Sequence, residues 1–139
     1  MTELSLPSIS EIEDDLQFFD SWEDKYRYII DLGKQLPAMA EHKRVPEVLV
    51  KGCQSQVWLY VRHDHDSLVL EVDSDAHIVR GLLALVVSAY QGLSPAQAVH
   101  LDIESVFERL QLLRHLSPSR GNGLRAMVER VRHLAAAYQ

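Results

Sequence analysis

The apolar positions of the chain change their spacing twice, from a helical period to an alternating one and back. Apolar side chains recur every three or four residues over about 9–19 and again from 20 or 21 to 36, which predicts two amphipathic helices. Ser8 and Ser10 each stand three residues before a glutamate, which is a capping-box signal for the first of these helices. Residues 37–46 contain two prolines and no clean period, and we expect them to form a loop.

The middle of the chain alternates apolar and polar residues, as half-buried strands do. A short β-prone run at 48–50 and two longer alternating runs at 57–62 and 68–73 predict an antiparallel sheet of about three strands. A polar turn at 63–67 joins the two longer runs. Turn-forming residues at 51–55 separate the short run from the first long one.

The helical period returns after residue 75 and continues to the end of the chain. A run over 78–90 is apolar on nearly all sides and predicts a central, buried helix. Three further helices are predicted: a short one from Pro95, one over 103–113 and one over about 124–137. The residues before the last of them, 116–123, are expected to form a loop. The predicted fold class is α+β, a single two-layer domain over residues 1–139 with about three strands and about five helices.

Composition adds limits on the class of protein. A chain of 139 residues with 47% apolar and 24% charged residues is not a disordered chain, a collagen or a disulfide-stapled small domain. No apolar run approaches the ~18 residues that a membrane-spanning helix needs. The first residues lack the basic and apolar segments of a signal peptide. We therefore expect a cytoplasmic protein without a membrane partner.

Charge is distributed unevenly along the chain, which has 14 basic and 20 acidic residues and a net charge of −6. Residues 1–33 hold nine acids and two bases, whereas residues 109–139 hold six arginines and one acid. The overall acidity argues against a nucleic-acid partner, which requires a basic surface. The arginines near the end are interpreted as the solvated face of a helix, with a local basic patch as the alternative.

A single cysteine, Cys53, excludes an intramolecular disulfide and any all-cysteine metal or iron–sulfur site, and no metal ligand set is predicted. Its neighbours are glycine, polar and basic residues: Lys51, Gly52, Gln54, Ser55 and Gln56. Consecutive backbone N–H groups in such a turn can form an anion site. Lys51 would lower the pKa of the thiol if its ammonium group points inward. The residues alone leave a reactive cysteine and an inert packing cysteine equally open.

Four chemistries use a cysteine of this kind. A cysteine hydrolase needs a positioned histidine, and none of the seven histidines stands in a recognisable hydrolase signature. The phosphate-binding loop of a cysteine phosphatase is absent from the sequence. A peroxide-reducing thiol lacks a resolving cysteine in this chain. Sulfur carriage needs only one cysteine, an anion-tolerant loop and surfaces on which donor and acceptor dock.

The segment Gly52–Trp58 resembles the signature loop of the SufE family, the sulfur-acceptor partners of cysteine desulfurases. Further similar motifs follow in the family's order: Trp22–Tyr26, Ile29–Gly33, Ser74–Ala76, Ile78–Val79, Gly81–Leu82, Leu116–Arg120 and Gly123–Leu124. The tripeptide at 54–56 is closer to SufE than to the paralogous CsdE branch.

The resemblance implies that Cys53 takes sulfur, as a persulfide, from a pyridoxal-phosphate-dependent desulfurase of the SufS or CsdA kind. The sulfur would pass to an iron–sulfur scaffold such as SufBCD. The chain would be a sulfurtransferase-like accessory protein, a monomer or weak homodimer, and it would bind no cofactor because the pyridoxal phosphate belongs to the desulfurase. The implied fold is like that of IscU, but IscU holds its cluster with three cysteines, so this chain is not expected to be a scaffold.

The resemblance also assigns roles to residues around Cys53. Asp75 lies near the position linked to desulfurase docking, although it is equally suited to cap the helix that follows. Arg120 falls on the family's other loop, close to the cysteine, where it either steadies the sulfur anion or bonds loop carbonyls. Gln54 and Gln56 are interpreted as forming loop hydrogen bonds, with partner contact as the alternative.

Two features concern the loop itself. In the family, the loop is thought to turn its sulfur toward an apolar cavity when idle and to swing out on docking. Many members carry an asparagine five positions before the cysteine, where this chain has Val48, so a side chain that would anchor the loop is missing.

Two rival functions remain open. The first is a regulatory module that reshapes the desulfurase's active site without carrying sulfur, with the acidic first helix and Asp75 supplying the docking charge. The second is a cysteine hydrolase that acts without a partner. The fate of sulfur on Cys53 distinguishes all three.

Overall fold

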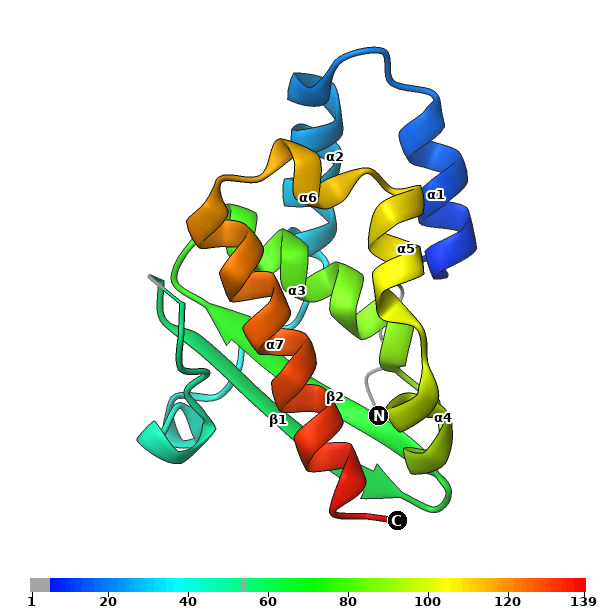
Figure 1. Cartoon of the computed structure of the whole chain (residues 1–139). Helices are drawn as coiled ribbons and strands as arrows, with labels where there is room; N and C mark the ends of the chain where they lie inside the picture. Colours follow the sequence, from blue (N-terminus) through cyan, green and yellow to red (C-terminus); the bar gives the residue numbers. More distant parts are fainter. Residues whose placement is uncertain (1–5, 54) are drawn as a thin grey trace.

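The computed structural model describes residues 6–53 and 55–139. They form seven α-helices, two short 3-10 helices and a two-stranded antiparallel sheet, with α3 and α7 packed against the sheet (Figure 1). The α-helices are α1 (Ile9–Gln17), α2 (Trp22–Lys34), α3 (His77–Tyr90), α4 (Pro95–His100), α5 (Ile103–Arg109), α6 (Leu112–His115) and α7 (Pro118–Ala136). The 3-10 helices are η1 (Glu41–Lys43) and η2 (Pro46–Val48), and the strands are β1 (Val57–Asp64) and β2 (Ser67–Ser74).

The α+β class is confirmed, but the sheet has two strands rather than about three. β1 and β2 pair from Val57 opposite Ser74 to Asp64 opposite Ser67. The third strand predicted at 48–50 is reduced to one bridge between Leu49 and Trp58 and one backbone hydrogen bond from Val50 N to Val57 O, 2.8 Å long. Since η2 ends at residue 48 and a turn begins at 51, only two extended residues are left to pair with β1.

The described chain has seven α-helices, whereas about five were expected from six helical segments. One of these segments, 103–113, divides into α5 and α6. The division falls at Gln111, whose φ of +55° no helical residue adopts. The loop predicted at 116–123 is wrong as well, since α7 begins at Pro118. Ser117 caps it by accepting a hydrogen bond from the N–H of Arg120, with proline in the first turn. Two glycines in α7, Gly121 and Gly123, suggested a loop but are buried helical residues.

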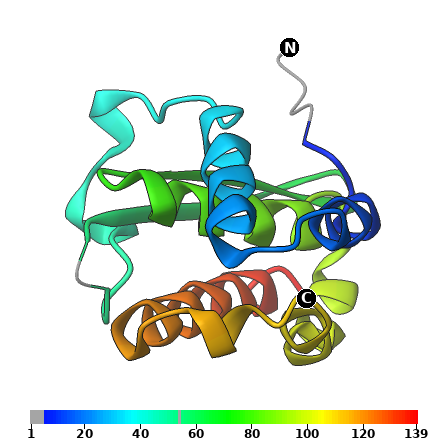
Figure 2. The same cartoon turned by 90° about the horizontal axis from the view of Figure 1, so that it is seen from above.

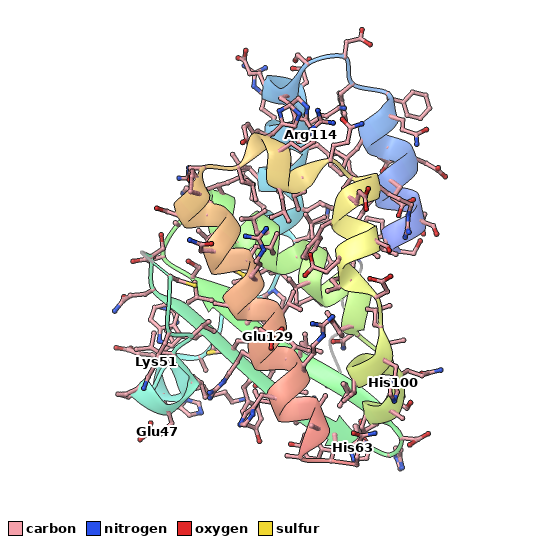
Figure 3. The ribbon with its side chains drawn as sticks, viewed as in Figure 1. Glu47, Lys51, His63, His100, Arg114 and Glu129 are labelled. Atoms are coloured by element: carbon pink, nitrogen blue, oxygen red, sulfur yellow. The ribbon has the colours of Figure 1, made fainter. Side chains whose placement is uncertain are left out.

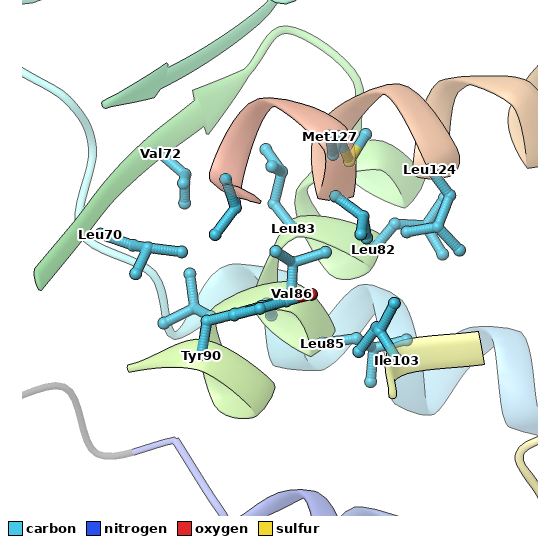
Figure 4. Packing of buried hydrophobic residues seen from close by; sticks show 14 of the residues in the cluster. Leu70, Val72, Leu82, Leu83, Leu85, Val86, Tyr90, Ile103, Leu124 and Met127 are labelled. Atoms are coloured by element: carbon cyan, nitrogen blue, oxygen red, sulfur yellow. The ribbon is translucent and has the colours of Figure 1, made fainter. Parts of the chain in front are cut away.

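α3 lies at the centre of the fold and is buried along most of its length. Figure 4 shows side chains of α3, among them Leu82 and Val86, packed between α7 and the hairpin. α7 crosses one face of the hairpin, and the segment 37–50 lies on the other face (Figures 1 and 2). None of the helices in the described residues has both the length and the apolar character of a bilayer-crossing segment.

Two glycines allow α2 and α3 to touch backbone to backbone. A Cβ on Gly33 would lie 2.6 Å from the backbone nitrogen of Gly81. A Cβ on Gly81 would overlap the carbonyl of Ile29 and lie 2.7 Å from Ile29 Cγ2. The close helix crossing that anchors α3 therefore depends on the absence of a side chain at both positions.

Gly81→Ala is expected to lower the free energy of unfolding by about 3 kcal/mol, because the added methyl group forces α2 and α3 apart. Gly121→Ala is the matched control. There a Cβ would meet only the side chain of Leu113, at an ordinary 3.6 Å, and alanine favours the helix over glycine. Urea unfolding of both variants tests this, and equal stabilities for Gly81→Ala and the wild type would contradict the crossing geometry.

Asp73 is a buried carboxylate, 1% exposed, although the alternating pattern placed it on the polar side of its strand. It accepts hydrogen bonds from the backbone N–H groups of Met39 and Ser74, at 2.9 and 2.8 Å. Arg44 and Arg80 both form ion pairs with it. Although burial raises the pKa of Asp73, these donors and charges outweigh it and hold the pKa below its usual value.

Candidate functional site

Cys53 lies between Val50 and Val57, which are joined by a hydrogen bond from Val50 N to Val57 O. The described residues between them, 51–53 and 55–56, are called the loop. Gly52 has a φ of +93°, in the left-handed region that glycine enters without strain. A Cβ on Gly52 would sit 3.6 Å from the Cβ of Ala126 on α7. The loop thus lies directly against the surface of α7.

The Cys53 thiol points at the backbone of α7. Its Sγ lies 3.7 Å from the carbonyl oxygen of Gly123 and donates a hydrogen bond to it. A Cβ on Gly123 would come within 3.4 Å of this sulfur, closer than most side-chain contacts. A glycine at 123 therefore gives the sulfur room to approach the helix backbone.

The thiol borders a cavity of about 140 Å³ between the loop, α3 and α7. The residues around it are Cys53, Ser55, Val79, Leu82, Ser117, Ser119, Arg120, Gly123 and Met127. Apolar residues of α3 and α7 therefore share the cavity with three serines and one arginine. Since a water molecule takes about 30 Å³ in the liquid, the cavity has room for a second sulfur atom on Cys53.

Burial raises the pKa of the Cys53 thiol above its usual value. The hydrogen bond to Gly123 acts in the same direction, because only the neutral thiol can donate it. Lys51 is exposed and has no ion pair or hydrogen bond with the rest of the described chain. Figure 3 shows it at the edge of the molecule, away from α6 and its Arg114. The expectation that Lys51 lowers the thiol pKa does not hold in this conformation.

Alkylation of Cys53 by iodoacetamide is therefore expected to follow a pH profile with a midpoint above that of a free thiol, about 8.5. Only the thiolate reacts, so the folded protein should react slowly at neutral pH. In denaturing urea, the midpoint should fall to the ordinary value because burial is lost. A midpoint in the folded protein at or below that of the unfolded chain would contradict the buried, neutral thiol.

Asp75 holds the far end of the loop. Its carboxylate accepts a 3.1 Å hydrogen bond from the backbone N–H of Gln56. The neighbouring Ser74 hydroxyl donates to the Gln56 carbonyl at 2.7 Å and accepts from the N–H of Ala76. The alternative that Asp75 caps the next helix is wrong, since α3 has Ala76 at its N-cap and no side-chain cap. The exposed Asp75 carboxylate is joined to the loop instead.

The other predicted site residues that the structure describes lie either beside the cavity or next to Asp75. Ser55 and Arg120 border the cavity with Cys53, so the structure brings these three together. Gln56 meets Asp75 and Ser74 through its backbone. Arg120 is exposed, and no carboxylate of the described residues pairs with it. The prediction for Gln54 concerns a residue outside those that the structure describes.

Side chains of α2 contact His115, just before α7, and α7 forms one side of the cavity. The indole ring of Trp22 stacks on the ring of His115, with centroids 3.9 Å apart. The Tyr26 hydroxyl donates a hydrogen bond to the His115 carbonyl. Trp22 and Tyr26 thus fix the residues just before Ser117, the N-cap of the helix that carries Arg120 and Gly123.

The sequence placed Arg120 close to the cysteine but did not connect Gly123 or Met127 of α7 with it. Gly123 was assigned to the predicted loop over 116–123, and Met127 to the last predicted helix. The dipeptide Ser117–Pro118 carried the signal, because a capping serine followed by proline predicts a helix start, as it does at Ser94 and Pro95. With α7 begun there, the glycines at 121 and 123 fall inside a helix.

Comparison with known proteins gives matches over most of the chain. The family model SufE, described as an Fe-S metabolism associated domain, matches residues 10–135. An uncharacterized SufE-like protein from Rhizobium etli is 48% identical over 136 residues, covering 95% of this chain and 92% of that protein. A second, from Rhizobium meliloti, is 44% identical over 131 residues, 91% of this chain and 94% of that protein.

A solved structure shares the fold. The solution structure of a hypothetical protein from Thermus thermophilus superposes with a TM-score of 0.76 and covers 93% of both chains. Its sequence is only 15% identical, so the likeness concerns the arrangement of helices and strands alone.

Proposed function

Since this chain belongs to the SufE family and thereby to Fe–S metabolism, we propose that it accepts sulfur on Cys53 from a cysteine desulfurase. The observation that carries this proposal is the position of Cys53, on a loop against α7 with its sulfur beside a cavity. A loop whose two ends are held by hydrogen bonds can turn outward to a partner and return. The cavity can then enclose the sulfur atom carried on Cys53.

The chemistry is a transfer of one sulfane sulfur between two thiols. The Cys53 thiolate attacks the outer sulfur of the desulfurase's cysteine persulfide, so a new S–S bond forms on Cys53. The S–S bond of the donor breaks, and its cysteine leaves as a thiolate. No external oxidant or reductant is needed. In the second step, a thiol of the acceptor attacks the outer sulfur on Cys53, and Cys53 leaves as a thiolate.

Arg120 is proposed to stabilise the sulfur anion on Cys53 when the loop lies inward. Arg120 borders the same cavity and no carboxylate of the described residues pairs with it, so its charge is available to an anion. A persulfide ionises more readily than the parent thiol and would gain from this charge. Asp75 is proposed to take part in docking, because it is exposed and joined to the loop at Gln56.

The partners proposed are a desulfurase of the SufS or CsdA kind, which supplies the pyridoxal phosphate, and a scaffold complex such as SufBCD. The cytoplasm is the compartment proposed, because a reducing environment keeps a lone thiol ready for transfer. Stimulation follows from removal of the persulfide, which returns the desulfurase's own cysteine to its thiolate form.

The test is the turnover of a SufS-type desulfurase, measured as alanine released from cysteine. Untreated protein is expected to raise the rate in a saturable way. Protein whose Cys53 has been blocked with iodoacetamide is expected to leave the rate at its basal value. Equal stimulation by the blocked protein would favour the regulatory module over the sulfur carrier. Turnover of thioesters or peptides by this chain alone would favour the hydrolase.

A further inference from the structure

A second contact joins α7 to the segment before the cysteine loop. Arg130 Nη2 donates a 2.9 Å hydrogen bond to the carbonyl oxygen of Glu47, in η2. The two residues are 83 positions apart in the sequence. Arg130 Nε is fully buried and has no partner among the described residues, so the side chain is drawn in along the helix surface rather than extended into solvent.

Arg130 stands on the face of α7 that carries the loop. Gly123, Ala126 and Arg130 follow one another at helical spacing and so line one side of the helix. Each contacts one part of the segment from Glu47 to Cys53: Gly123 contacts Cys53, Ala126 lies beside Gly52, and Arg130 donates a hydrogen bond to Glu47. These three positions form a continuous seat, which we call the α7 seat.

The three residues between Glu47 and Lys51 offer no side chain for this anchor. Val48, Leu49 and Val50 are apolar, so their side chains cannot form hydrogen bonds to the backbone of the loop. The far end of the loop has its own carboxylate at Asp75. At the end of the loop that follows Val48, Leu49 and Val50, the anchor is therefore the hydrogen bond from Arg130 to the carbonyl of Glu47.

We infer that Arg130 is a positioning residue for Cys53, which keeps the loop on the α7 seat by holding the carbonyl of Glu47. It acts through the backbone of η2 and does not touch the sulfur. Its part in sulfur transfer rests on the proposed function, whereas its effect on the thiol does not. Loss of the anchor lets the loop leave α7 more often and exposes Cys53 to solvent.

The direction of the pH effect separates this role from a simple charge effect. When the loop leaves the seat, the thiol is less buried, so the midpoint of its alkylation profile falls toward the ordinary value. Removal of a positive charge by itself would raise the midpoint, because a cation favours the thiolate. A fall can therefore come only from release of the loop.

The experiment measures the rate of iodoacetamide reaction with Cys53 against pH, in the full chain without a desulfurase. Arg130→Met keeps an unbranched apolar side chain and removes the donor. Its rate at neutral pH is expected to rise about fivefold, the change in an opening equilibrium when a hydrogen bond of ordinary net strength is lost. The midpoint should fall, and Arg130→Lys, which keeps a donor, should recover part of the wild-type rate.

Arg125→Met is the matched control, since Arg125 is an exposed arginine of the same helix with no hydrogen bond or ion pair within the described residues. It should leave both rate and midpoint unchanged. Wild-type behaviour of Arg130→Met, or equal changes in both methionine variants, would overturn the inference. If Arg130→Met does not fold, as judged by circular dichroism, Arg130→Lys alone decides, and a rate equal to that of the unfolded chain would overturn it. Failure of the proposed function would show separately, as a wild-type protein that takes no sulfur.

Discussion

Cys53→Ser is expected to accept no sulfur and to leave desulfurase turnover at the rate measured without this chain. The reaction requires a thiolate, and a serine hydroxyl is neither ionised nor able to form a stable bond of this kind to sulfur at neutral pH. No other cysteine in the sequence can take over. The loss should therefore be complete rather than partial.

The same variant should keep its fold and its affinity for the desulfurase. A serine hydroxyl can still donate to the Gly123 carbonyl, and Cys53 is only partly buried. Thermal unfolding and calorimetric titration against the desulfurase measure these two properties. Full stimulation of the desulfurase by Cys53→Ser would contradict the sulfur-carrier mechanism. Loss of binding together with loss of stimulation would show that the cysteine contributes to docking instead.

Asp73→Ala is expected to lower the free energy of unfolding by about 4 kcal/mol, because it leaves two arginines without their shared carboxylate. Arg80 is largely buried beside Asp73, and the backbone N–H of Met39 also loses its acceptor. Small domains have only about 5–15 kcal/mol of net stability, so this variant should lie close to unfolding. Urea unfolding at neutral pH measures the difference.

Glu71→Ala is the matched control, from the same strand. Glu71 also pairs with two basic side chains, Lys43 and Arg62, but these pairs are exposed and should contribute less than about 1 kcal/mol. Equal losses in the two variants would contradict the claim that burial makes the Asp73 network strong.

Acid should act on the same network. Since the pKa of Asp73 is lowered in the folded state, its contribution is present above the unfolded value of about 3.9 and is lost as pH falls through the folded pKa. Wild-type protein should therefore lose stability below about pH 4 more steeply than Asp73→Ala. Parallel pH profiles for the two proteins would show that Asp73 is not held in its charged form.

Much of the fold follows from local patterns, and its exceptions come from contacts between distant segments. The capping serines at 8 and 21 begin α1 and α2 within a residue or two of their predicted starts. Local propensity misplaced the start of α7, because Gly121 and Gly123 favour loops. Gly123 lies against Cys53, 70 residues earlier in the chain, and no window of neighbouring residues reveals this contact.

The candidate site shows the same division. The resemblance of the Gly52–Trp58 segment identified the family and singled out Cys53, and the family is confirmed. The seat under the loop could not be predicted, because Gly123, Ala126 and Arg130 are at least 70 residues from their partners. Asp73 was misread for a similar reason, since its arginine partners come from the loop after α2 and from α3.

The most direct test of the central claim is the intact mass of this chain after incubation with free cysteine and a catalytic amount of a SufS-type desulfurase. A gain of one sulfur atom is expected, which a thiol reductant removes and which Cys53→Ser does not show. An unchanged mass, with a desulfurase that is demonstrably active and binds the chain, would contradict sulfur transfer to Cys53. Cys53 would then be a residue that only packs against α7.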